Sequence, residues 1–296
     1  MSVEVFEPSE TPTQTAPDGL GIVLFNHVGS TVSQDTGRDA HDITNRYGLP
    51  VIAVDRPGSA CPSDRTLAQA LGNPRVYLLH MDILGKEIDR RADSLGVHSL
   101  IAVGRSAGAV AALALARTEV VGSLRYIAAA EPVACEPMSV KDGLRRYRQY
   151  HLDQRQLIIE ARRNDSDLIR PQSPSLPIGE AAMRIASLVP AAYTDRYNNK
   201  FHWSSDAAAQ YVEYLAEHSD VDTTIEFATH SLAGNFAVVS YLRDVGASYR
   251  QPADAPFVVR RAPVETVHAS YDNRDYMNGT FLGRIVARAA VDPHGG

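Results

Sequence analysis

The stretch "LIAVGRSAGAVAALALA", residues 100–116, decides the fold, because a five-residue turn in it joins an apolar run to an alanine-rich run. The first run has the length and composition of a buried strand, and the second has those of a helix. Gly104 and Gly108 each stand two residues from Ser106 in this turn. A serine on so sharp a turn takes a strained backbone conformation, and small neighbours let other chain pass close by. The pattern therefore predicts that Ser106 is a nucleophile, although a helix-capping serine at a glycine-rich turn is the alternative.

Other apolar runs of strand length surround this stretch. Most of them are apolar on both faces, as in a parallel sheet that helices cover. The runs are residues 21–27, 49–55, 99–104, 124–131, 222–230 and 255–263. Helical patterns over 35–47, 81–95 and 106–118 alternate with the first four runs. This alternation predicts an α/β fold with a mostly parallel central sheet flanked by helices.

The alternation stops near residue 135, and strand patterns return near residue 221. The chain between them is polar and aromatic, with helical patterns over 140–163, 179–189 and 205–218. Helices inserted at the carboxyl edge of a sheet often form a cap over a site. We expect a core of residues 19–136 and 221–296, a helical cap insertion of residues 137–220, and a flexible N-terminal arm of residues 1–18, in which "VEVF" could be a short edge strand.

Composition and charge exclude several classes of partner. The 296 residues are 44% apolar and carry a net charge of -6, with no basic block of the kind that binds phosphates, so we expect no nucleic-acid partner. No stretch approaches the roughly 18 apolar residues of a membrane span, and the N-terminus has no signal-peptide pattern. We therefore expect a cytoplasmic protein with no membrane partner, which the two cysteines also fit. No Cys/His grouping has zinc spacing, so we expect neither a metal nor another cofactor. Nothing in the sequence indicates an oligomeric state.

A serine hydroxyl is a weak nucleophile at neutral pH, so a histidine should lie near Ser106. Among the ten histidines, His268 follows the last strand pattern and precedes a terminal helical pattern. A loop at that place can return a side chain to the edge of the sheet, although a surface-loop histidine is the alternative. The helix after Ser106 would direct the backbone N–H of Ala107 at a developing oxyanion.

Three stretches carry a family resemblance: "IVLFNHVGS" (22–30), "YGLPVIAVDRPGSACPS" (47–63) and "LGVHSLIAVGRSAG" (95–108). Together with a late loop histidine, they resemble the α/β-hydrolase superfamily, and more narrowly its capped bacterial serine hydrolases. The resemblance covers about residues 20–135 and 220–290 and leaves the cap unmatched. It implies the chain order serine, acid, histidine. It also implies a second oxyanion donor in the loop "NHVGS", for which we choose the backbone N–H of Val28.

The acid departs from the usual family pattern. In most members it follows the first strand after the cap, but here that loop reads "THSLAGNFAVV" and has Asn235, not a carboxylate, near the usual position. Some relatives place the acid at the end of the strand that follows the elbow helix, where this chain has Glu131. Adjacent parallel strands lie about 4.8 Å apart, so side chains at their ends can reach one histidine. We predict Glu131 as the acid, with Glu136 and Asp272 as weaker candidates and a structural, solvent-facing Glu131 as the alternative.

These residues predict a serine hydrolase that cleaves an ester, thioester or lactone of a medium-sized apolar small-molecule substrate. His268 would remove the proton of Ser106, Ser106 would attack the carbonyl, and Glu131 would stabilise the imidazolium. The N–H groups of Ala107 and Val28 would bind the substrate oxyanion. Two alternatives stay open: acyl transfer, cyclisation or elimination on the same triad, and a non-catalytic small-molecule binding protein on the same fold.

Overall fold

A computed structural model describes residues 2–8, 17–27, 32–57, 74–118, 120–132, 140–164, 166–171, 214–215, 221–231 and 257–291. The strands are β1 (Val3–Phe6), β2 (Leu20–Phe25), β3 (Val51–Val54), β4 (Ser99–Arg105), β5 (Leu124–Ala130), β6 (Asp222–Phe227) and β7 (Phe257–Arg261). The helices are α1 (Gly37–Tyr47), α3 (Pro74–Ser94), α4 (Ala107–Arg117), α5 (Val140–Arg163) and α9 (Leu282–Val291). Shorter helical turns are η1 (Val32–Thr36), η2 (His268–Asp272) and η3 (Asp275–Phe281).

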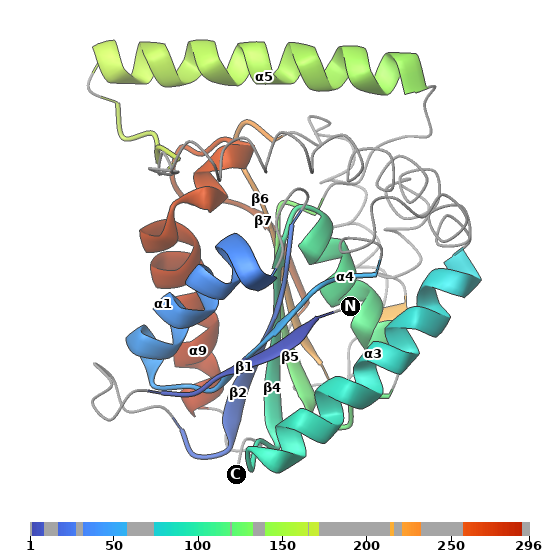
Figure 1. The fold of residues 1–296 in the computed structure, drawn as a ribbon. Coiled ribbons are helices and arrows are strands. Elements are labelled where there is room, and N and C mark those ends of the chain that lie inside the picture. Colours follow the sequence, from blue (N-terminus) through green and yellow to red (C-terminus); the bar gives the residue numbers. More distant parts are fainter. Residues whose placement is uncertain are drawn as a thin grey trace.

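The strands form one sheet in the order β1-β3-β2-β4-β5-β6-β7. Every neighbouring pair is parallel except β1, which runs antiparallel to β3. Helices α1 and α9 cover one face of the sheet, and α3 and α4 cover the other (Figure 1). This arrangement confirms the predicted α/β fold with a mostly parallel sheet flanked by helices.

Differences from the predicted elements lie at their ends. Strand β6 stops at Phe227, whereas the apolar pattern continued to residue 230, and α3 begins at Pro74 rather than near residue 81. Strand β1 is the edge strand that was the alternative for "VEVF", so residues 3–6 of the expected flexible arm pair with β3.

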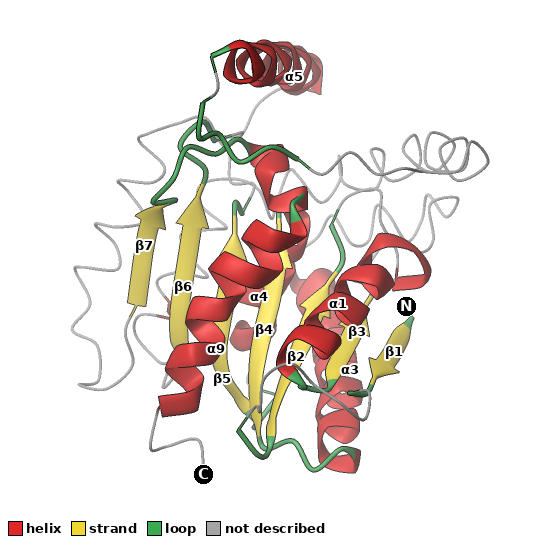
Figure 2. Ribbon diagram, turned by 90° about the vertical axis from the view of Figure 1, so that its left-hand side faces the viewer, coloured by secondary structure: helices red, strands yellow, loops and turns green. Residues whose placement is uncertain are grey.

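The insertion is described only in part. Its first helical pattern coincides with α5, which lies beyond the carboxyl ends of the strands in Figure 2. The pattern over 179–189 and most of that over 205–218 lie outside the described residues. A helical cap of residues 137–220 therefore stays a prediction.

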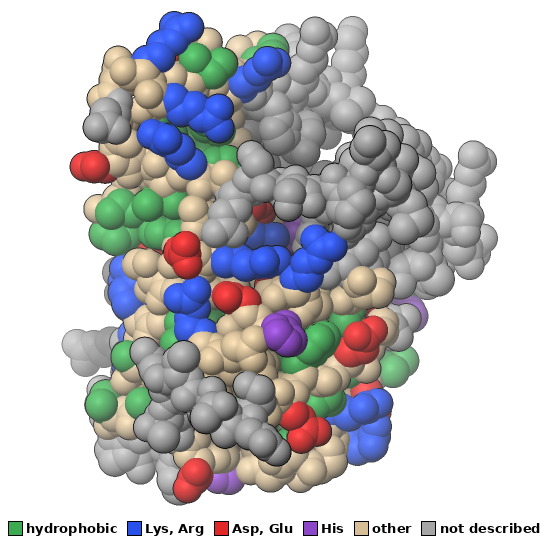
Figure 3. Space-filling view, turned by 60° about the vertical axis from the view of Figure 1, so that its left-hand side comes forward, with side chains coloured by type: hydrophobic (Ala, Val, Ile, Leu, Met, Phe, Trp, Pro, Cys, Tyr) green, Lys and Arg blue, Asp and Glu red, His purple; other side chains and the backbone are tan. Residues whose placement is uncertain are grey.

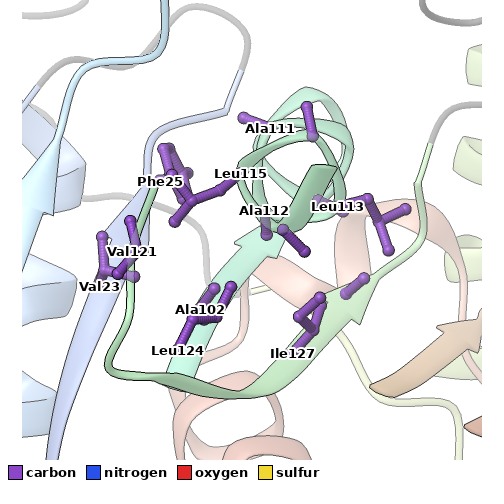
Figure 4. Close-up of a cluster of buried hydrophobic side chains, with 14 of the residues drawn as sticks. Val23, Phe25, Ala102, Ala111, Ala112, Leu113, Leu115, Val121, Leu124 and Ile127 are labelled. Carbon is purple, nitrogen blue, oxygen red and sulfur yellow. The ribbon is translucent and has the colours of Figure 1, made fainter. Parts of the chain in front are cut away.

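Helix α4 lies at the centre of the core cluster on one face of the sheet. Every residue from Ala107 to Ala116 is buried, and these small side chains let the helix lie close to β2, β4 and β5. Figure 4 shows Val23, Ala102 and Ile127 of the strands facing this helix. Burial of this kind contributes about 25 cal/mol per Å² of apolar surface, so α4 holds the turn before it firmly in place.

A buried carboxylate stabilises the opposite face of the sheet. Glu226 of β6 is fully buried and accepts hydrogen bonds from the hydroxyls of Tyr276 (2.9 Å) and Tyr271 (3.3 Å). It also pairs with Arg260 Nε at 2.9 Å and with Arg284 Nη2 at 3.2 Å. Because two cations and two hydroxyls surround it, this buried charge is compensated. The cluster joins the helices at the C-terminal end of the chain to the sheet.

Three tyrosines on this face keep their protons at high pH. Burial raises the pKa of Tyr271 and of Tyr276, and the charge of Glu226 raises both further. Burial also raises the pKa of Tyr47 to about 12. The hydroxyl of Tyr47 donates to the carbonyl of Asn278, so this side chain links α1 to η3.

We expect the free energy of unfolding to fall as the pH rises above about 10, the ordinary tyrosine pKa. The folded state keeps these tyrosine protons where the unfolded chain has lost them, so unfolding releases protons and a higher pH favours it. Each such group contributes a slope of about 1.4 kcal/mol per pH unit. Urea unfolding between about pH 8 and about pH 11.5 measures this slope. Tyr271→Phe should make the slope shallower, and equal slopes in the variant and the wild type would contradict the assignment.

Candidate active site

Ser106 occupies a strained turn between β4 and α4. Its backbone dihedrals are φ 54° and ψ −121°, which side-chain-bearing residues rarely adopt. A Cβ added to Gly104 would lie 2.2 Å from the carbonyl carbon and oxygen of Gly108. A Cβ on Gly108 would lie 2.8 Å from the carbonyl oxygens of Phe25 and Asn26. Both glycines are therefore required by close backbone contacts, which explains the Gly-x-Ser-x-Gly spacing.

Glu131 lies beside Ser106, directly after the neighbouring strand β5. Arg105 and Ala130 are paired across β4 and β5, so the next residues, Ser106 and Glu131, lie at the same level of the sheet. The backbone N–H of Ser106 donates to the carbonyl of Ala130 at 3.0 Å, and the backbone N–H of Glu131 donates to the backbone carbonyl of Glu226 at 2.6 Å. Among the non-glycine residues that the structure describes, only Ser106 and Glu131 have a positive φ, 54° and 48°. Such conformations cost about 1–3 kcal/mol each and cluster at functional sites.

The carboxylate of Glu131 faces His268. Its Oε1 lies 3.7 Å from Nδ1 of His268, and the Glu131 side chain is fully buried whereas that of His268 is 20% exposed. The backbone N–H of Ala228 donates to Oε2 at 2.7 Å, and the hydroxyl of Ser231 donates to Oε1 at 2.5 Å. The distance from Oε1 to Nδ1 is longer than a hydrogen bond, so the two groups are close neighbours that are not directly bonded.

The loops that follow β6 and β7 lie side by side next to His268. The chain after β6 and the chain after β7 pair through a bridge between His230 and Val267. The hydroxyl of Thr229 accepts from the backbone N–H of Thr266 at 2.8 Å, and the Thr266 hydroxyl accepts from the N–H of Thr229 at 3.1 Å. These reciprocal bonds fix the start of η2, where His268 stands.

The chain that leaves α5 also contacts the loop that carries His268. The backbone N–H of Ile169 donates to the carbonyl of Glu265 at 3.0 Å. The carbonyl of Ile169 accepts from the hydroxyl of Ser270 at 2.5 Å. The side-chain amide of Asn273 donates to the backbone carbonyl of Arg170 at 2.9 Å. The insertion is therefore tied to this loop on both sides of His268.

The strand order reverses between β2 and β4, and α/β sheets usually bind ligands beyond the carboxyl ends of the strands at such a point. Ala107, the first residue of α4, has a backbone N–H with no acceptor inside the helix, as every helix start does. At the end of β2, the side-chain oxygen of Asn26 accepts from the backbone N–H of Arg56 at 2.8 Å. Val28, the other predicted oxyanion donor, lies outside the described residues.

The other predicted acids are placed differently. Asp272 pairs with Arg105 Nη1 at 2.9 Å, so its carboxylate already has a cation. Glu136 and Asn235 lie outside the described residues.

Sequence reasoning missed Ser231, although a hydroxyl in the loop that lacks the usual carboxylate was a visible signal. Within the described ranges, no three His, Cys, Asp or Glu side chains gather as a metal site.

Basic side chains gather over α5 at one end of the molecule (Figure 3). Arg155, Arg162 and Arg163 are exposed there, which is typical of a solvated helix face. The inner side of this helix is apolar, with Ala161 packed against Leu168 and Val267. None of the helices in the described part of the chain is both long enough and apolar enough to cross a lipid bilayer.

No family model matches this sequence, and no curated protein matches it. Solved structures do match. A proline iminopeptidase from Mycobacterium smegmatis superposes with a TM-score of 0.55 at 14% identity, covering 98% of this chain and 95% of the other. An enol-lactonase from Burkholderia xenovorans gives 0.51 at 14%, covering 96% and 95%. An esterase from Exiguobacterium antarcticum gives 0.54 at 12%, covering 96% and 94%. These likenesses establish that the chain has the α/β-hydrolase fold.

Proposed function

We propose that this protein, on its α/β-hydrolase fold, is a serine hydrolase with Ser106 as nucleophile, His268 as base and Glu131 as acid. One observation carries the proposal: the strained Ser106 stands beside a buried glutamate whose carboxylate lies 3.7 Å from Nδ1 of His268. Strain of this kind is kept only where the surrounding structure enforces it. Two strained residues directly after adjacent strands, both chemically suited to a triad, favour catalysis over a structural role.

The proposed reaction uses these groups in turn. With Nδ1 facing Glu131, Nε2 of His268 is left to accept the proton of the Ser106 hydroxyl as Oγ forms a bond to the substrate carbonyl carbon. Glu131 stabilises the imidazolium, and the N–H groups of Ala107 and Val28 stabilise the oxyanion. His268 then gives the proton to the leaving oxygen or sulfur, which departs and leaves an acyl-enzyme. Water, deprotonated by His268, releases the acid and restores Ser106.

The substrate class in this proposal is an ester, thioester or lactone of a medium-sized apolar molecule. Its support is that the structures of an enol-lactonase and an esterase resemble this chain along nearly its whole length. A non-catalytic binding protein was plausible when the usual acid position lacked a carboxylate. The carboxylate of Glu131, 3.7 Å from Nδ1 of His268, supports the hydrolase over this alternative.

Labelling with a small fluorophosphonate tests this function. We expect a single adduct by intact mass, which peptide mapping places on Ser106, because the probe imitates the tetrahedral acyl intermediate. The adduct should be absent in Ser106→Ala and in His268→Ala and present in Ser94→Ala, which changes an exposed serine at the end of α3. A folded wild-type protein that takes no label at Ser106 would contradict the proposal and favour the binding protein.

A further inference from the structure

We propose that Arg105 is a positioning residue that clamps the loop carrying His268 to the turn carrying Ser106. The expected effect on catalysis rests on the proposed function, whereas the contacts between Arg105 and the loop do not depend on it. Arg105 directly precedes Ser106 in the chain, at the variable position of the Gly-x-Ser-x-Gly pattern. No rule of the pattern demands an arginine there.

The alternation along β4 decides where this arginine lies. Ile101 and Val103 belong to the core on the face covered by α1, η3 and α9, and Arg105 follows at the same spacing. Its side chain is only 14% exposed. The guanidinium is thus held at the carboxyl edge of the sheet, on the side from which η2 and η3 approach.

One side of the guanidinium binds η2. Nη1 donates to the carbonyl of Tyr271 at 2.5 Å and lies 2.9 Å from Oδ1 of Asp272. Both partners stand within the single turn that begins at His268, three and four residues after it. The residue before the nucleophile is therefore bonded to the turn that carries the base, across 166 residues of sequence.

The other side of the guanidinium faces α1. Nη2 lies 3.6 Å from Oδ2 of Asp39, and Oδ1 of the same carboxylate accepts from Nε of Arg274 at 2.8 Å. Two cations and two carboxylates therefore balance within this cluster. Asp39 is 16% exposed, similar to Arg105, whereas Asp272 is 48% exposed. The inner ion pair is thus partly shielded from solvent, which strengthens it.

These contacts require an arginine, because its guanidinium is a rigid, planar group with donors on both sides. A guanidinium can bind a carbonyl and a carboxylate on one side and a second carboxylate on the other, whereas a lysine ammonium is a single point charge. Proton transfer requires Ser106 and His268 within hydrogen-bond reach, and a displacement of about 1 Å can slow such chemistry about 100-fold. The clamp would keep His268, the first residue of η2, within this reach of Ser106. Its loss should therefore lower the chemical rate and leave binding little changed.

The test compares Arg105→Gln and Arg105→Lys with the wild type by two measurements. Hydrogen exchange follows the backbone amides of Ser270 and Asn273, which are bonded inside the loop. Fluorophosphonate labelling gives the maximal rate of inactivation and the half-saturating probe concentration separately. The control is Arg288→Gln, which removes an ion pair to Asp222 at the amino end of β6, the end of the sheet opposite the candidate site.

In Arg105→Gln we expect at least tenfold faster exchange at these two amides. The maximal inactivation rate should fall by about 10- to 100-fold, with little change in the half-saturating concentration. Arg105→Lys should lie between Arg105→Gln and the wild type, and Arg288→Gln should change neither measurement. Unchanged exchange in Arg105→Gln would overturn the clamp, and faster exchange with an unchanged inactivation rate would overturn its positioning role. If the wild type takes no label while exchange rises in Arg105→Gln, the proposed function fails and the link from Arg105 to the loop stands.

Discussion

Glu131→Gln should slow the acylation of Ser106 by about 10⁴-fold while the protein stays folded. The N–H of Ala228 donates to one oxygen of Glu131, so the glutamine must place its carbonyl oxygen there. Its NH₂ group then takes the position of Oε1, toward Nδ1 of His268, and the Ser231 hydroxyl, which donates to Oε1 in the wild type, must turn to accept. An amide donor at Nδ1 makes that nitrogen the acceptor and leaves the ring proton on Nε2. In this tautomer Nε2 cannot take the proton of Ser106, and the imidazolium has no carboxylate beside it.

Single-turnover labelling with the fluorophosphonate measures this loss directly. The matched control is Glu265→Gln, the same carboxylate-to-amide change three residues before His268. Glu265 is 45% exposed and pairs with His230, so we expect a change within about threefold. If Glu131→Gln kept the wild-type rate while Glu265→Gln did the same, the assignment of Glu131 as the acid would be wrong.

The turn at Ser106 could be predicted because its cause is local. The glycines at 104 and 108, the apolar run before them and the alanines after them all lie within 17 residues, and together they dictate strand, turn and helix. The place of Glu131 needed the resemblance as well, because only the strand order sets it beside Ser106. Pairing of Arg105 with Ala130 then follows from that order.

Other contacts could not be assigned from the sequence, even at Ser231, where a hydroxyl stands in the loop that lacks the usual carboxylate. Ser231 reaches Glu131 across 100 residues, and Arg105 reaches Tyr271 across 166. Such pairs depend on how loops from separate strands cross, which neither periodicity nor composition records. For residues 3–6 the sequence left two alternatives open, a flexible arm and an edge strand, and the pairing with β3 decides between them. Long-range pairing thus accounts for what the sequence alone left open.

Gly104→Ala should abolish the folded state or lower the melting temperature by at least about 10 °C. The added Cβ would meet the carbonyl carbon and oxygen of Gly108 at 2.2 Å, a distance that atoms of this kind cannot share. Relief requires moving backbone, because no flexible side chain is in the way. Helix α4 cannot move away from β4 without losing packing, because every residue from Ala107 to Ala116 is buried. With a total stability of about 5–15 kcal/mol, a domain has little reserve for such a change.

Thermal unfolding of Gly104→Ala and Gly122→Ala separates this contact from the general effect of replacing glycine. Gly122 precedes β5, has no atoms within 4 Å of an added Cβ and does not need a positive φ. Alanine there should shift the melting temperature by no more than about 2 °C. A Gly104→Ala protein as stable as Gly122→Ala would mean that α4 can move away from β4. The first turn of α4 could then not hold the N–H of Ala107 in a fixed direction, and the oxyanion site proposed at Ser106 would lose its structural basis.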